Sequence, residues 1–166
     1  MEKNLNSKEA IEKLKALTNQ TGTCMFFTNV QAGVYNTRPM VIIEVDGNGT
    51  CWFFTNKNSE MVSDIEKDSH VHLVFSNPIK ESYLDLRGRA SIQHDRKSIE
   101  EKWNPIVKAW FPEGKDDPEL CLVKVKTDEA HYWDNNNTKM VEIVKTVASI
   151  ISGKQPSQGV HGDLLV

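Results

Sequence analysis

The turn D-G-N-G at residues 46–49 constrains the fold more than any other feature of this sequence. It contains both D-G and N-G, the strongest short-range signals for a β-hairpin, because these pairs tolerate the positive φ angles of a tight hairpin turn. β-forming residues flank the turn, so we expect antiparallel strands over residues 35–46 and 50–55. The stretch from residue 40 to 45 is apolar at nearly every position, which predicts burial on both faces.

Other segments with β-strand character follow one another along the chain, with few helical segments between them. Parallel strands need crossover helices, so neighbouring strands of this kind favour antiparallel pairing in a small barrel or a strongly curled sheet. Gly88, in the middle of one strand, predicts a bulge or a close backbone approach. The remaining predicted strands cover residues 23–30, 70–76, 82–95, 120–127 and 129–134. Helices are expected after Ser7, after Asn58 or Ser59, after Ser98 and around 140–151.

Length and charge limit the class of protein. The 166 residues suit one domain, and the net charge of −3, with lysines scattered among acids, argues against nucleic acid as a partner. No apolar run approaches the roughly 20 residues that cross a bilayer, so no membrane partner is expected. The polar start lacks the apolar segment of a secretory signal, and we expect a cytoplasmic protein.

Common catalytic and metal-binding patterns are missing from the sequence. It has no G-x-G-x-x-G after a strand, no P-loop and no G-x-S-x-G, which disfavours Rossmann domains, P-loop NTPases and α/β-hydrolases. Cys24, Cys51 and Cys121 are far apart, so reduced, buried thiols are expected. His70 and His72 share one strand face, but further ligands are not identifiable, so no metal site is predicted.

The segment after the hairpin has features of an anion site. Residues 55–59, T-N-K-N-S, lead from a strand into a helix, and the free N–H groups of a helix N-terminus attract phosphate. Thr55 and Ser59 add hydroxyl groups, and Lys57 adds charge. The hairpin is expected to place the strand of Arg38 beside residues 50–55, so that Arg38 contacts the same anion. The alternative is a plain strand-turn-helix connection with an ordinary cap.

A group of aromatic residues in the second half of the chain could form the wall of a binding site. Such rings often enclose a flat heterocycle, although packing in the hydrophobic core is the alternative for each of them. The group consists of Trp103, Trp110, Phe111, Tyr132 and Trp133.

Several of these segments, in this order, resemble the general stress protein 26 group of the pyridoxamine 5'-phosphate oxidase-like superfamily, whose fold is the FMN-binding split barrel. The matching segments together cover most of residues 10–152, and the longest of them, from Trp103 to Leu120, is unusual in composition. They are TRPM at residues 37–40, CWFFTNKNSE at 51–60, LDLRGRASI at 84–92, the segment 103–120, and YWD at 132–134.

The resemblance implies a mainly β fold of the α+β kind, a six- to seven-stranded antiparallel split β-barrel with flanking helices. The domain is expected to cover residues 1–152, and the loop-like composition of residues 153–166 predicts a flexible tail. The resemblance also implies a homodimer with two flavin sites at the subunit interface. The dimer is expected to bury the apolar sides of residues 40–45.

The cofactor implied by the resemblance is FMN, with FAD as an alternative. In the arrangement it implies, the strand of residues 37–40 lies along the flavin, with Arg38 near the phosphate. Phe54 and Thr55 border the site, and Ser59 binds the phosphate. Trp110 and Trp133 lie near the ring, from the same chain or its partner. The residues concerned are Thr37, Arg38, Pro39, Met40, Phe54, Thr55, Ser59, Trp110 and Trp133.

The sequence departs from the family pattern at Met61. The family often has a lysine two residues after the serine, where it contacts the phosphate. A hydrogen bond to a charged group contributes about 1.5–3 kcal/mol, so FMN binding is expected to be roughly ten- to a hundred-fold weaker here. Lysine at position 61 is expected to tighten it.

The main functional hypothesis is a flavin-dependent oxidoreductase linked to the general stress response, acting on an unknown small molecule or a nicotinamide reductant. The sequence identifies no catalytic residue. Two alternatives remain. One is a non-catalytic flavin carrier or sensor, and the other is a degenerate split barrel that holds no flavin and acts by protein contact.

Overall fold

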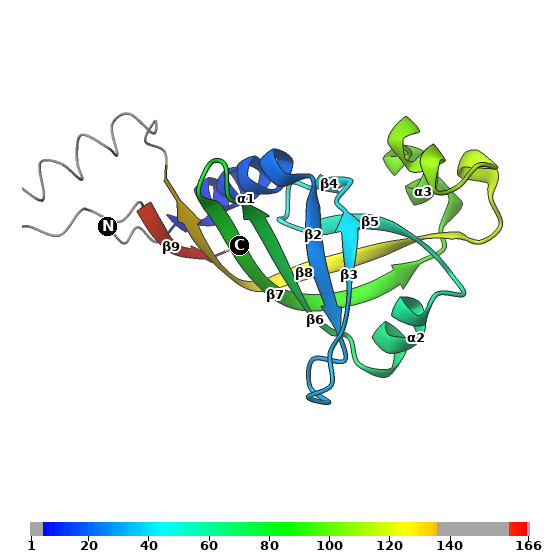
Figure 1. Cartoon of the computed structure of the whole chain (residues 1–166). Coiled ribbons are helices and arrows are strands. Elements are labelled where there is room, and N and C mark those ends of the chain that lie inside the picture. Colours follow the sequence, from blue (N-terminus) through cyan, green and yellow to red (C-terminus); the bar gives the residue numbers. More distant parts are fainter. Residues whose placement is uncertain (1–4, 136–159, 166) are drawn as a thin grey trace, which may run out of the picture.

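The computed structural model describes residues 5–135 and 160–165. A curled sheet forms its centre, with α1 packed along one side, α2 below β3, and α3 with two short 3-10 helices at one end (Figure 1). The helices are α1 (Ser7–Thr21), α2 (Glu60–Lys67), α3 (Arg96–Lys102), η1 (Pro105–Ala109) and η2 (Gly114–Asp116). The strands are β1 (Leu5–Asn6), β2 (Thr23–Thr28), β3 (Asn36–Val41), β4 (Glu44–Val45), β5 (Cys51–Asn56), β6 (His70–Asn77), β7 (Ser82–Gln93), β8 (Leu120–Asp134) and β9 (Val160–Leu165).

The long strand β8 determines the topology. Along one edge it pairs with β7, and along the other it pairs first with β5 and then with β9, so the sheet divides there. The remaining order is β7-β6-β2-β3, and the pairs in the described residues are antiparallel except β1 with β9. The predicted antiparallel split barrel is confirmed. Residues 120–127 and 129–134, which we expected to be two strands, form the single strand β8.

Gly88 marks a bulge in the β7–β8 ladder, as its position in mid-strand predicted. Arg87 pairs with Glu129 and Gly88 with Thr127, so Asp128 is the extra residue of the bulge. A Cβ atom on Gly88 would lie 2.2 Å from the carbonyl oxygen of Lys126. Only glycine allows the two backbones to approach so closely.

The D-G-N-G turn forms a hairpin, but a shorter one than expected. The Asp46 N–H donates to the Thr50 carbonyl at 2.9 Å, and only the two residues of β4 pair with β5. The strand of Arg38, β3, pairs with β2 instead, which corrects the expectation that Arg38 lies on the partner strand of residues 50–55. The chain changes partners between Ile42, which donates to Gly22, and Ile43, which donates to Trp52.

Two hydrophobic clusters stabilise the fold. The larger lies inside the curled sheet under α1, where Phe26 and Phe53 pack edge to face, and the smaller joins β5 and β8 to α3 and η1. Within residues 40–45 only Ile42 and Val45 are buried, so the predicted burial on both faces is wrong for the single chain. No helix among the described residues is long and apolar enough to cross a lipid bilayer.

The C-terminal segment differs from the predicted flexible tail. Residues 160–165 form β9, which pairs with the second half of β8, and Leu164 is 1% exposed. The edge of β8 at this point offers backbone N–H and C=O groups that β9 satisfies, while Leu164 joins the main core. The helix predicted around residues 140–151 lies outside the described residues.

Candidate functional site

The N-terminus of α2 presents two hydroxyl groups. Of the two predicted caps, Asn58 and Ser59, it is Ser59 that caps the helix, and its Oγ accepts from the Val62 N–H at 3.4 Å. The Thr55 hydroxyl, at the end of β5, lies 3.4 Å from the Ser59 hydroxyl. Both side chains are half-buried, so the start of α2 combines partly accessible hydroxyl groups with the positive end of a helix dipole.

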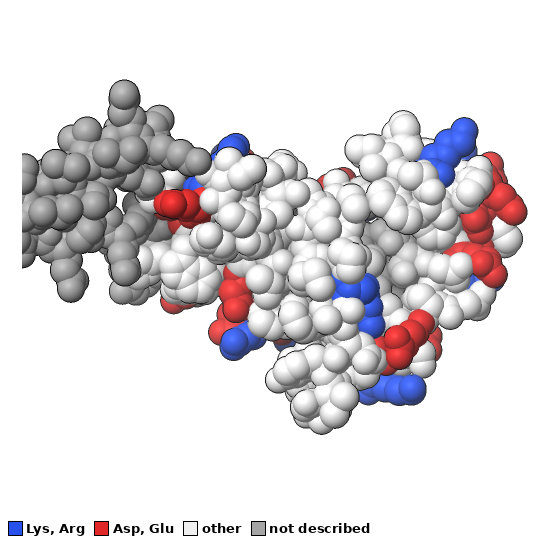
Figure 2. Space-filling view, viewed as in Figure 1, with Lys and Arg blue, Asp and Glu red and all other residues white. Residues whose placement is uncertain are grey.

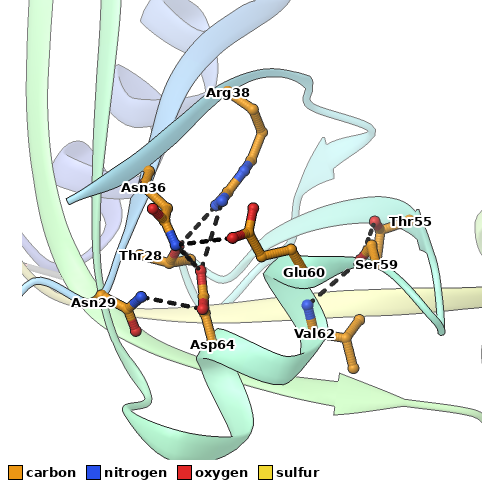
Figure 3. Close-up of polar contacts among 9 residues, drawn as sticks. All are labelled: Thr28, Asn29, Asn36, Arg38, Thr55, Ser59, Glu60, Val62 and Asp64. Atoms are coloured by element: carbon orange, nitrogen blue, oxygen red, sulfur yellow. Dashed lines mark hydrogen bonds and ion pairs between the residues drawn. The ribbon is translucent and has the colours of Figure 1, made fainter. Parts of the chain in front are cut away.

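Arg38 points from β3 toward α2 (Figure 3). Its Nη1 donates to the Thr28 hydroxyl at 2.8 Å, and its Nη2 lies 3.6 Å from the Asp64 carboxylate of α2. The Arg38 side chain is 22% exposed, so the guanidinium is held against the protein rather than in bulk water. These contacts occupy part of its five N–H donors and leave the others available to an anion.

Asp64 is the centre of a polar network under this guanidinium. Its carboxylate accepts hydrogen bonds from Thr28 at 2.7 Å, Asn36 at 2.9 Å and Asn29 at 3.0 Å. Burial acts to raise the pKa of Asp64, but these hydrogen bonds and the Arg38 charge outweigh it and hold the pKa below its usual range. Asp64 is therefore an anion at neutral pH, although it is only 5% exposed.

An apolar cleft of about 420 Å³ lies beside the segment that leads into α2, since Thr55 and Asn56 are among its lining residues. It has β3 and β5 on one side and the η1 segment on the other, and none of its described lining residues is ionisable. Figure 2 shows a hollow between the part of the surface around α3 and the part over β3, within a largely uncharged face. The lining consists of Thr23, Pro39, Met40, Val41, Ile43, Phe54, Thr55, Asn56, Ile106, Val107, Trp110 and Phe111.

Thr55 joins the two parts of the site, because it lines the cleft and contacts Ser59. A molecule with a flat apolar part and an acidic ester would match this arrangement, with the apolar part in the cleft and the ester at Arg38 and the α2 N-terminus. The volume of the cleft falls in the range of about 300–1,000 Å³ that is typical of small-molecule sites.

The structure brings together most of the predicted site residues. Five of them line the cleft, namely Pro39, Met40, Phe54, Thr55 and Trp110, and Arg38 and Ser59 lie in the polar part. Thr37 is exposed on β3, and Trp110 is 60% exposed at the mouth of the cleft.

Trp133 lies apart from the cleft within one chain. It lines a second hollow of about 370 Å³ on the outer face of β7, β8 and β9, and it packs edge to face against His131 at 4.5 Å. In a single chain, therefore, Trp133 and Trp110 line different hollows.

Met61, which stands where the family often has a lysine, is a buried residue of α2. Its side chain is 3% exposed and belongs to the main hydrophobic core. A lysine with the same side-chain direction would point into the core, so the structure does not support the expectation that lysine here tightens phosphate binding.

Sequence reasoning missed Asp64 and its partners Thr28, Asn29 and Asn36. A signal was available, because Met61 and Ile65 define the inward stripe of α2 and Asp64 lies on that stripe. An acidic residue on a buried stripe needs partners, and it therefore indicates a polar network.

The cysteines and the remaining histidines lie outside the site. The three thiols are free and buried, as expected, and burial raises the pKa of Cys51 to about 12 and that of Cys121 to about 11. His70 is hydrogen-bonded to Asp68, and His72 is hydrogen-bonded to Asp85. In the part of the chain that the structure describes, no three His, Cys, Asp or Glu side chains are grouped to hold a metal ion.

Comparison with known proteins identifies a family and a relative that are similar to this chain in sequence. Residues 9–157 match the family described as pyridoxamine 5'-phosphate oxidase like. The protein bli-3 of Neurospora crassa is 28% identical over 104 residues, which are 58% of this chain and 50% of that protein. The chain thus spans only half the length of this relative.

Solved structures with the same fold extend the comparison. A protein of Jannaschia sp. CCS1, provisionally identified as general stress protein 26, has a TM-score of 0.78 at 21% identity, over 95% of this chain and 96% of that chain. The general stress FMN/FAD binding protein of Xanthomonas citri has a TM-score of 0.65 at 27% identity, over 78% of this chain and 90% of that chain.

Proposed function

This chain belongs to the pyridoxamine 5'-phosphate oxidase-like family, and we propose that it binds a flavin, with FMN as the cofactor and FAD as the alternative. The observation that carries the proposal is the junction at Thr55 of an apolar cleft with a polar group of donors. The name of the similar Xanthomonas citri protein, which includes FMN/FAD binding, supports the proposal.

Each part of the site would hold one part of the flavin. Pro39, Met40 and Phe54 would contact the ring system, and the exposed Trp110 would cover it at the mouth of the cleft. Arg38 and the hydroxyl groups at the start of α2 would hold the phosphate by charge-assisted hydrogen bonds. Asp64 and Glu60 reduce the positive potential there, so we expect modest rather than tight FMN binding.

We further propose a flavin-dependent oxidoreductase of the general stress response. A bound flavin supplies electron and hydride transfer, and the chain supplies binding, orientation and exclusion of water. The described lining of the cleft holds no ionisable side chain, so a proton consumed there would come from solvent or from the substrate. The absence of an ionisable side chain from this described lining also favours a second candidate, a non-catalytic flavin carrier or sensor.

Flavin binding is tested with Arg38→Ala. Since Arg38 would contact the phosphate directly, we expect FMN affinity to fall roughly ten- to a hundred-fold in a fluorescence titration. Arg89→Ala is the matched control, because Arg89 is an exposed arginine paired with Asp128 on the bulge of β7 and β8. Equal affinity in Arg38→Ala and Arg89→Ala would contradict the phosphate assignment. Wild-type protein that binds no flavin would indicate a barrel that acts by protein contact.

The choice between oxidoreductase and carrier depends on reduction of the bound flavin. Flavin-loaded protein is mixed anaerobically with NADH or NADPH, and the visible absorption of the oxidised flavin is followed, with a dye acceptor added for turnover. Loss of the flavin bands followed by turnover supports an oxidoreductase. Bands that persist with both nicotinamides favour the carrier.

We also propose a homodimer. Met25, Tyr83 and Trp133 are large exposed side chains on the outer face of the sheet, where Tyr83 and Trp133 are directly paired. Figure 2 shows that the surface over β2 and β3 is largely uncharged. Contact through this face would cover these side chains and could bring the partner's Trp133 toward the cleft. We expect a dimer in sedimentation at micromolar concentration, and a monomer would contradict the proposal.

A further inference from the structure

We propose that Asp64 is a positioning residue that holds the Arg38 guanidinium in the orientation in which it binds the flavin phosphate. This inference rests on the proposed function. Asp64 would not touch the phosphate, since it is an anion and is buried beneath the arginine. It would act through Arg38.

Two routes connect Asp64 with Arg38. The direct route is the ion pair, with 3.6 Å between Nη2 and the Asp64 Oδ2. The second runs through Thr28, whose hydroxyl accepts from Arg38 Nη1 at 2.8 Å and donates to the same Oδ2 at 2.7 Å. Nη2 thus faces this carboxylate oxygen directly and Nη1 is linked to it through Thr28, and the two contacts together restrict the plane of the guanidinium (Figure 3).

The carboxylate is itself held by residues of three segments, and β3 contributes only Asn36. Asp64 lies on α2, Thr28 ends β2, and Asn29 follows Thr28, while Asn36 at the start of β3 donates to Oδ2. Asn29 has a φ of 58°, a left-handed conformation that asparagine tolerates better than most residues. Three donors meet a single carboxylate, and an amide in its place has only one acceptor oxygen for them.

A fixed guanidinium binds an anion more tightly than a mobile one, because less side-chain entropy is lost on binding. The rival explanation is that Asp64 only stabilises the fold. Another is that its negative charge competes with the phosphate for Arg38. These explanations predict different effects on the preference for FMN over riboflavin, which lacks the phosphate.

The experiment compares dissociation constants for FMN and riboflavin in the wild-type chain, Asp64→Asn, Arg38→Ala and the double variant. We expect the wild type to prefer FMN, and we expect Asp64→Asn to lower this preference about three- to ten-fold. This effect is smaller than that of losing a charged hydrogen bond completely, because Arg38 itself is still present. In the Arg38→Ala background, Asp64→Asn should change the preference no further. A purely structural residue would weaken both ligands equally.

Two other variants, Asn29→Gly and Thr28→Val, extend the test to the partners of Asp64. Asn29→Gly removes a hydrogen bond to Oδ1, the oxygen that does not face Arg38, so it should lower the preference for FMN less than Asp64→Asn does. Thr28→Val removes the relaying hydroxyl at nearly constant volume and should lower the preference as Asp64→Asn does. It tests the proposal even if Asp64→Asn does not fold.

The outcomes separate this inference from the proposed function. The positioning role is overturned if folded Asp64→Asn shows an unchanged or increased preference for FMN. If Asp64→Asn does not fold, the same result in Thr28→Val overturns it. Flavin binding by the wild type without preference for FMN also overturns it, but leaves flavin binding intact. Binding of neither flavin by the wild type refutes the proposed function, and the inference with it.

Discussion

At the scale of single residues, Met61 shows how burial determines what a position can do. It follows Ser59 by two residues, and its side chain lies in the core with Ile65 and Phe53 rather than beside the hydroxyl groups at the start of α2. The phosphate contacts proposed for this chain therefore depend on Arg38, Thr55 and Ser59, and not on a cation at position 61.

This placement predicts the effect of Met61→Lys. Because the ammonium group would have to enter the core or displace the start of α2, we expect the free energy of unfolding to fall by about 3 kcal/mol or more. FMN affinity should not rise. Urea denaturation measures the first effect, with Met61→Leu as a control that should change stability by less than about 1.5 kcal/mol. A stable variant that binds FMN more tightly would show that the lysine reaches the phosphate.

At the scale of secondary-structure elements, the bulge between β7 and β8 controls the path of the longest strand. Asp128 is the extra residue, and its carboxylate is bonded to Arg89 at 3.0 Å through two nitrogen atoms. Beyond the bulge the other edge of β8 turns from β5 to β9. The bulge thus lies where the barrel divides.

Gly88→Ala tests this element. The new Cβ would meet the backbone oxygen of Lys126, which cannot move aside as a side chain can, so the ladder must shift. We expect a loss of about 2 kcal/mol or more in the free energy of unfolding. Gly47→Ala, in the exposed hairpin turn with no atom within 4 Å of the new Cβ, should stay within about 0.5 kcal/mol. Equal effects of the two substitutions would contradict the close approach.

At the scale of the whole molecule, buried and hydrogen-bonded carboxylates make stability depend on pH. For Asp46, as for Asp64, burial acts to raise the pKa, but hydrogen bonds outweigh it, here from Trp52, Asn48 and Thr50, and the pKa is lowered. A carboxyl group whose pKa is lower in the folded state stabilises the protein above its unfolded pKa, near 3.9. That contribution is lost as the pH falls through the folded value.

We therefore expect acid unfolding rather than sensitivity near neutrality. The urea midpoint should stay nearly constant from about pH 7 to 5 and fall below about pH 4, as both carboxylates become protonated. Asp64→Asn should reduce the slope of this decline, since one of the groups is removed. A decline centred near pH 6.5 would instead indicate histidines as the responsible groups.

Local features of the molecule were determined by the sequence alone. The D-G-N-G turn, the Ser59 cap and the glycine at the bulge were all predicted, because each depends on backbone conformations and hydrogen bonds between residues close in the chain, or on the absence of a side chain. The antiparallel barrel followed from the order of such segments. Of the site, the residues of β3, β5 and the α2 cap were predicted in this way, with the help of the family resemblance.

Contacts between distant segments were decided only by the tertiary structure. β3 pairs with β2 rather than β5, β9 completes the edge of β8, and Trp133 faces a hollow separate from the cleft. The ion pair of Arg38 with Asp64 joins residues 26 positions apart, from β3 and α2. Such pairings depend on which sheet edges and buried charges remain unsatisfied once the core has formed, and a pattern of neighbouring residues does not contain that information.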